Sequence, residues 1–276
     1  MARKNHDALP YDTIRLEGAL FVPDLLERLA RGEGEAQQAS DYHLPKGITL
    51  ADEQGRAFQI ARAQWLEFAS RSARQDIDQP TLTLDFVREL LTDSLHHTLE
   101  CAQSVEATDR IYSVPLIAHG RVPVFVAPHA ISLDESSDLF PVQGSGSRRR
   151  SVFRLAQEFL NASPACTWAL VSNGRRLRLL RDAATLTRPC FLEFDLETIL
   201  ASNRYPDFVA LWRLLHGSRA GAKGTPGSTC IWEDWRNKGL AQGTRVRDGL
   251  REGVTQALIV FGNGFLQHTD NRVLRA

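Results

Sequence analysis

Arginines are the residues of this sequence best suited to binding chemistry. Between residues 145 and 181 there are eight arginines and one acidic residue, Glu158. A guanidinium can bind a phosphate through two parallel hydrogen bonds, so this cluster on a chain of zero net charge predicts contact with double-stranded DNA. The plainer alternative is a solvated strand face with a basic loop. The residues expected to contact DNA are Arg148, Arg149, Arg150, Arg175, Arg176 and Arg178.

The charges of the two parts of the chain differ in sign. Residues 1–110 hold 12 Lys and Arg against 19 Asp and Glu, whereas residues 111–276 hold 21 against 14. Such an asymmetry fits a local anionic partner better than a general polyanion binder. It also fits a basic surface that docks against the acidic N-terminal part of the same chain.

Carboxylates are poorly placed for metal-dependent hydrolysis. A magnesium nuclease needs two carboxylates to hold the metal and a lysine nearby. The strand-like run 122–127 contains neither an acid nor a lysine. An active endonuclease would have to use Asp134 with Glu158, which is an unusual pair. We therefore expect no catalytic residues and no metal ligands, although the endonuclease stays open as an alternative. No further metal-ligating residue follows His96 and His97 at helical spacing, so we expect these histidines to lie on the surface or to pack against another helix.

The spacing of apolar residues predicts a mixed α/β chain. The pattern favours helices over 57–75, 84–102, 151–161, 205–216 and 231–261, with Gly262 as a helix stop. Short β-rich runs predict hairpins at 111–127 and 167–181, the second around a type I′ turn at Asn173-Gly174, and a strand at 190–195. Four segments are expected: an arm with helices (1–80), an α/β domain (81–216), a linker (217–230) and a helical connector (231–276).

The order of these elements from residue 84 onward resembles the core of PD-(D/E)xK nucleases, in which helices flank a mixed sheet. Because the acidic and lysine residues of that motif are missing here, the resemblance implies a degenerate nuclease-like fold. Helices on the N-terminal and C-terminal sides complete the expected architecture.

A second resemblance extends over residues 110–275. Its phrases are Gln157-Glu-Phe-Leu-Asn161, Ser172-Asn-Gly-Arg-Arg-Leu-Arg-Leu-Leu-Arg-Asp182, Glu193-Phe-Asp-Leu196 and Asp207-Phe-Val. They are similar to the N-terminal region of type IIG-like restriction–modification DNA adenine methyltransferases, which act in phage defence. In that family this region lies against DNA and precedes the catalytic module.

The resemblance implies a DNA-facing or scaffolding module, present as a fragment or split subunit, with a methyltransferase domain or subunit as its partner. S-adenosylmethionine and magnesium are expected only for the full-length family. A base-flipping adenine methyltransferase needs an Asn/Asp-Pro-Pro-aromatic loop, and this chain has no Pro-Pro pair. Phe261-Gly-Asn-Gly-Phe265 follows a helical pattern and reads as a helix stop. A purely structural interaction module, or the product of a truncated gene, remains an alternative.

The composition is typical of a globular protein, with 43% hydrophobic and 24% charged residues. No apolar run is long enough for a transmembrane helix, and the first residues lack the apolar segment of a signal peptide. These features predict a cytoplasmic protein without a membrane partner. The four cysteines show no metal-ligand spacing and are expected to be reduced.

Overall fold

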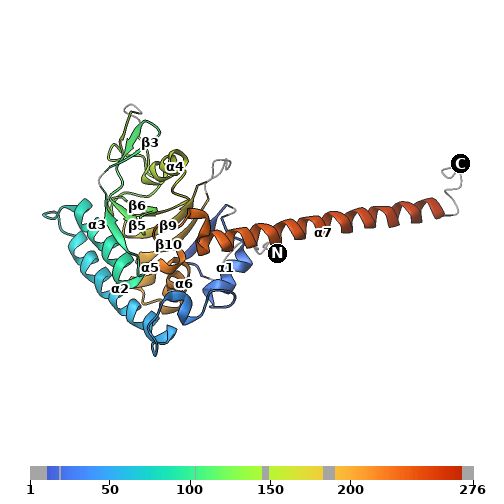
Figure 1. Ribbon diagram of the computed structural model, residues 1–276, viewed down its shortest axis with the longest axis horizontal. Coiled ribbons are helices and arrows are strands. Elements are labelled where there is room, and N and C mark those ends of the chain that lie inside the picture. The colour runs from blue at the N-terminus through green and yellow to red at the C-terminus, as the bar shows by residue number, and fades with distance from the viewer. Residues whose placement is uncertain (1–10, 19, 103, 145–148, 183–189, 269–276) are drawn as a thin grey trace.

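The computed structural model describes residues 11–18, 20–102, 104–144, 149–182 and 190–268. At its centre is a mixed seven-stranded sheet with the strand order β1-β10-β9-β8-β6-β5-β2, and a three-stranded sheet with the order β3-β4-β7 lies apart from it (Figure 1). The predicted mixed α/β class is therefore confirmed. The large sheet comprises β1 (Ile14–Glu17), β2 (Leu99–Cys101), β5 (Leu116–Ala118), β6 (Val122–Val126), β8 (Trp168–Ser172), β9 (Arg176–Arg181) and β10 (Phe191–Asp195). The small sheet comprises β3 (Val105–Ala107), β4 (Arg110–Tyr112) and β7 (Val142–Gln143).

Strands β6 and β8 are the parallel pair of the large sheet, and helix α4 (Val152–Ala162) lies between them in the chain. The other strand pairs of this sheet are antiparallel. All five residues of β8 are buried, and they alternate between two cores: Trp168 and Leu170 face one, Ala169 and Val171 the other. A near-continuous apolar run is what a strand covered on both faces requires.

Helices cover the two faces unequally. The larger core lies under α1 (Pro23–Ala30), α2 (Leu50–Ser72), α3 (Gln79–Glu89), α5 (Leu196–Ala201) and α6 (Tyr205–Leu215). The smaller core is formed by α4 and the small sheet. Ser151 is the N-cap of helix α4, and its side chain accepts a hydrogen bond from the Arg154 amide.

The predicted hairpin at 167–181 is present, but its turn is not of type I′. That type needs a positive φ at both central residues, and here Gly174 has φ +78° while Asn173 is not left-handed. Instead, the Asn173 side-chain oxygen accepts hydrogen bonds from the amides of Arg175 (3.1 Å) and Arg176 (2.9 Å). A Cβ at Gly174 would lie 2.9 Å from the Phe68 ring, so packing as well as conformation demands glycine.

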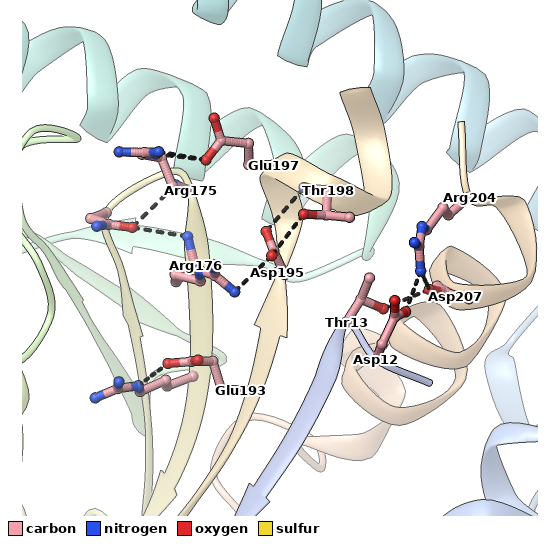
Figure 2. Close-up of polar contacts among 12 residues, drawn as sticks. Asp12, Thr13, Arg175, Arg176, Glu193, Asp195, Glu197, Thr198, Arg204 and Asp207 are labelled. Atoms are coloured by element: carbon pink, nitrogen blue, oxygen red, sulfur yellow. Dashed lines mark hydrogen bonds and ion pairs between the residues drawn. The ribbon is translucent and has the colours of Figure 1, made fainter. Parts of the chain in front are cut away.

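The described residues of the predicted N-terminal arm, from Tyr11 onward, belong to the main fold. Strand β1 pairs with β10, and the Thr13 hydroxyl donates to Asp207 of α6 (2.7 Å, Figure 2). The predicted helix over 84–102 also differs: α3 ends at Glu89, continues as the π-helical turn η2 (Leu90–Ser94), and the chain then enters β2. Hydrogen bonds to β5 replace helical ones there, because an edge position of the sheet is available to Leu99–Cys101.

The segment predicted as a linker, 217–230, is packed rather than extended. It forms the short turns η3 (Gly217–Arg219) and η4 (Gly227–Thr229), and the fully buried Arg219 lies over the ring of Tyr42 at 3.7 Å. The larger core runs from Ile14 to Trp235, so the predicted boundaries at 80, 216 and 230 do not separate independent cores.

Helix α7 (Ile231–Gln267) is one continuous helix of 37 residues, which begins on the body and projects far beyond it (Figure 1). The helix stop predicted at Gly262 is wrong, because the helix continues through it. A glycine inside a helix costs only about 1 kcal/mol relative to alanine. Within the described ranges, no helix is both long and apolar enough to cross a membrane.

Candidate functional site

The arginines of β9 form a ladder of ion pairs with the acids that follow them. Antiparallel register sets Arg176 opposite Asp195 and Arg178 opposite Glu193. The paired side chains approach to 2.8 Å and 2.5 Å, and Arg175 lies 2.7 Å from Glu197 at the start of α5 (Figure 2). Opposite charges on facing residues of an antiparallel pair stabilise the pairing. The ladder follows from the alternation within β9, in which Arg176 and Arg178 lie on one face and Leu177 and Leu179 on the other.

Arg178 is the buried member of the ladder. Only 4% of it is exposed, and its two terminal nitrogens donate to Asp134, each at 2.7 Å. Its guanidinium also lies 4.1 Å from the centre of the Phe191 ring. These hydrogen bonds from Arg178 lower the pKa of Asp134. Arg178 is thus a structural cation, and its donors are already used within the fold.

A polar hollow of about 410 Å³ lies beside the ladder. Its position follows from the topology, since His129 comes shortly after β6 and Asn173 directly after β8. The carboxyl ends of parallel strands are where α/β sheets usually bind ligands. Burial lowers the pKa of His129, so this ring is neutral near pH 7, and its Nδ1 has no hydrogen-bond partner among the described residues. The hollow is lined by His129, Ala130, Ser132, Leu133, Glu135, Asn173, Arg175, Arg176, Arg178, Glu193 and Glu197.

The remaining arginines predicted to bind DNA are separated by the fold. Arg148 lies outside the described residues. Arg149 is exposed, with Asp138 at 3.4 Å. Arg150 is only 2% exposed and lies 3.3 Å from Glu158 of α4. Although the sequence places Arg150 in a basic loop, its backbone pairs with Ser137 and draws it into the folded body.

The arrangement therefore neutralises the face that the sequence predicts to be basic. Arg175, Arg176 and Arg178 pair with four carboxylates, and a fifth, Glu135, also lines the hollow. The four are Asp134, Glu193, Asp195 and Glu197. Phosphate contact by Arg175 or Arg176 would require an exchange of partners, which makes it weaker than contact with unpaired arginines.

Asp134 and Glu158 are not brought together as a metal site. Asp134 is bound by Arg178, whereas Glu158 pairs with Arg150 and Arg154 and lines a different hollow beside Thr108. No cluster of histidine, cysteine and carboxylate residues suited to a metal ion occurs within the described ranges.

Comparison of the chain with protein-family models, curated proteins and solved structures finds no match.

One group of residues that the sequence analysis missed is brought together by the fold. His96 and His97 meet His119, from the turn after β5, and His216, from the end of α6. His97 is buried and packs as predicted, with its Nε2 2.8 Å from the carbonyl of Leu215. These histidines lie up to 120 residues apart, which hides their proximity in the sequence. The two His-Gly pairs, at 119–120 and 216–217, are the signal that could have drawn attention to them.

Proposed function

We propose that this chain is a non-catalytic scaffolding module of a restriction–modification DNA methyltransferase, with a methyltransferase domain or subunit docked on α7. The order α3, β2, β5, β6, α4, β8, with β6 parallel to β8, supports the resemblance to a PD-(D/E)xK core. The absence of acids from β5 and β6 supports a degenerate version of it. Such a core can hold a partner and face DNA without hydrolysing it.

The exposed apolar face of α7 carries the proposal. Leu250 and Leu258 are each 66% exposed and Phe261 is 74% exposed, which is unusual for a helix without a partner. At 1.5 Å per residue, the stretch 240–267 extends about 40 Å. The large exposed apolar residues of this stretch are Leu240, Val246, Leu250, Val254, Leu258, Ile259, Val260, Phe261, Phe265 and Leu266.

The pattern of this face fits a packed protein partner. Val246, Leu250, Val254 and Leu258 recur every four residues, so they drift slowly around the helix and form one long stripe. Arg245, Asp248 and Glu252 lie away from it, by the same spacing. A helix that presents such a stripe is typical of an element that docks into a groove or pairs with another helix.

DNA contact is the second part of the proposal, and it is confined to the exposed arginines. Arg149, Arg175 and Arg176 keep part of their guanidinium groups accessible, with side-chain exposures of 63%, 48% and 43%. Because each has a carboxylate partner, we expect contact to be weak and sequence-tolerant. Sequence recognition and methyl transfer would belong to the partner.

Co-purification with an adenine methyltransferase encoded beside this chain tests the proposal. The full chain should form a complex with it, and Leu250→Glu with Leu258→Glu should abolish the complex. Arg245→Glu with Glu252→Arg, on the other side of α7, is the matched control and should leave it intact. The absence of a neighbouring methyltransferase, or equal binding by both variants, would argue against the proposal. The chain alone should neither bind S-adenosylmethionine nor cleave DNA with Mg²⁺.

The alternative of an active endonuclease is less well supported. Its two candidate carboxylates, Asp134 and Glu158, are each paired with arginine and belong to different parts of the fold. If the purified chain cleaved DNA in a metal-dependent way and Asp134→Ala abolished this cleavage, the endonuclease alternative would be supported.

A further inference from the structure

A hollow of about 580 Å³ lies at the far end of the sheet from the arginine ladder, between α2, the end of α6 and the turn after β5. Four histidines line it: His43, His96, His119 and His216. Leu44, Pro45 and Ile48 form an apolar wall on one side. A cavity of this size with an apolar wall and a few polar groups is typical of sites for small organic molecules.

Three of these histidines have left-handed backbone conformations. The φ angles are +57° at His43, +58° at His96 and +53° at His119. This conformation costs a residue other than glycine about 1–2 kcal/mol. Seven non-glycine residues of the described chain adopt it, and three of them line this one hollow. Strained residues that gather in one place are characteristic of functional sites.

The backbone is also held very close behind the hollow. A Cβ at Gly217 would lie 2.2 Å from the carbonyl oxygen of His96, so only glycine fits there. The Gly217 amide donates to the Leu95 carbonyl at 2.6 Å, which ties the turn after α6 to the segment that carries His96. The positions of His96 and His216 are therefore fixed relative to one another, with ring centres 5.1 Å apart.

The hydrogen bonds assign the protons of the buried rings. His97 Nε2 donates to the Leu215 carbonyl, so its Nδ1 accepts from His119 Nε2 at 3.2 Å. His216 Nδ1 accepts from the Ser218 amide at 3.1 Å, which leaves the proton on Nε2. Burial lowers the pKa of His97 to about 3 and that of His216 to about 2, so both rings are neutral at pH 7.

One hydrogen-bond donor in the wall of the hollow has no acceptor among the described residues. His216 is buried, and its Nε2 has no hydrogen-bond partner among the described residues. A buried donor without an acceptor is destabilising by about 1–3 kcal/mol. An acceptor supplied by a ligand would remove that penalty.

The charges around His216 favour an anion as that acceptor. After burial, interactions with His96, His97, Arg219 and His43 lower the pKa of His216, and of these groups Arg219 carries a permanent positive charge. Arg219 from η3 is fully buried against Tyr42. The carboxylate that lines the hollow, Glu53 of α2, is already held by hydrogen bonds from Arg56 (2.5 Å) and His96 (2.7 Å).

We propose that this histidine hollow binds a small organic anion, whose oxyanion accepts the buried Nε2–H of His216 while its apolar part packs against Leu44, Pro45 and Ile48. Phosphate monoesters and carboxylates share the required chemistry.

Calorimetry of the full chain with inorganic phosphate, phenyl phosphate and benzoate tests the inference. At least one organic anion should bind saturably, and the organic anions should bind more tightly than inorganic phosphate, because they also contact the apolar wall. Preference for phenyl phosphate would assign a phosphate monoester, and preference for benzoate a carboxylate. No binding of any probe at millimolar concentration would overturn the inference.

Two matched pairs of variants locate the site. His216→Gln keeps a donor near the position of Nε2 and should change affinity by less than about threefold, whereas His216→Asn loses that donor and should weaken binding about tenfold. Ile48→Glu should weaken binding at least as much, by repulsion together with the loss of an apolar contact, and Ile48→Gln should weaken it less, because it loses only the apolar contact. Since Ile48 is an exposed residue, this second pair gives an answer even where His216→Asn fails to fold. Unchanged affinity in Ile48→Glu would show that the anion binds elsewhere and would contradict the proposed site.

Discussion

Arg178 holds three segments together through one buried guanidinium. It binds Glu193 of β10 and Asp134 of the loop after β6, and its guanidinium lies over the ring of Phe191. In Arg178→Met the stem remains but Glu193 is left buried without a cation, so we expect a loss of about 3–5 kcal/mol in the free energy of unfolding. Arg176→Met, at a half-exposed pair, should lose no more than about 1 kcal/mol. Urea unfolding measures both, and equal losses would contradict a structural role for Arg178.

His97 and His216 make stability depend on pH. Their folded pKa values, about 3 and about 2, lie below the ordinary value of 6.5, so the unfolded chain binds more protons at acidic pH. The contribution of the two neutral histidines to the free energy of unfolding is fully present above about pH 6.5 and is lost as the pH drops below that value. At pH 5 each histidine should contribute a loss of about 2 kcal/mol. His97→Gln, which keeps a donor for the Leu215 carbonyl, should flatten the profile between pH 5 and 7.5. A profile as steep as that of the wild type would refute the assignment.

Glycines in α7 separate its docked part from its projecting part. A Cβ at Gly239 would lie 2.9 Å from the side chain of Val22, whereas at Gly253 nothing lies within 4 Å. Gly253→Ala should therefore raise helix stability by about 1 kcal/mol, because alanine loses less backbone entropy. Gly239→Ala should instead loosen the packing of α7 on the body and lower the thermal midpoint. Circular dichroism melts of the two variants distinguish these effects, and shifts of the same sign would contradict this division of the helix.

Elements stabilised by local contacts were predictable from sequence. Helix α4, the β8–β9 hairpin, β10 and α6 lie within one or two residues of their predicted bounds, since each combines a clear apolar period with a cap or turn. Strand β2 was missed, because Leu99 continues a helical spacing and only pairing with β5 makes it a strand. The continuity of α7 through Gly262 was missed for a related reason. Glycine only favours the end of a helix, and here an apolar stripe continues beyond it and the helix does too.

Charge pairing across the whole molecule explains why the candidate site was only half predictable. The alternation of arginines on β9 is visible in the sequence, but their partners Asp134 and Glu193 lie 44 and 15 residues away. The opposite charges of the two parts of the chain are also used within the fold, where Lys223 pairs with Glu100 at 2.5 Å and Arg204 pairs with Asp12. Much of the basic excess that predicted DNA contact therefore serves folding, and the exposed arginines are what remains for an external partner.

DNA binding by the whole molecule should accordingly be weak, sequence-tolerant and dependent on a few arginines. In Arg149→Ala/Arg175→Ala/Arg176→Ala, the slope of log affinity against log salt should fall by about one for each phosphate that the variant no longer binds. Arg150 and Arg178 are left unchanged, because their burial would confound binding with folding. The matched control removes three exposed arginines of α2, α3 and the turn between them, Arg71, Arg74 and Arg88, which are also paired with acids. Fluorescence anisotropy at about 50–200 mM salt measures the slope. The same slope in both triple variants, or no binding at the lowest salt, would leave the docking of α7 as the supported role of this chain.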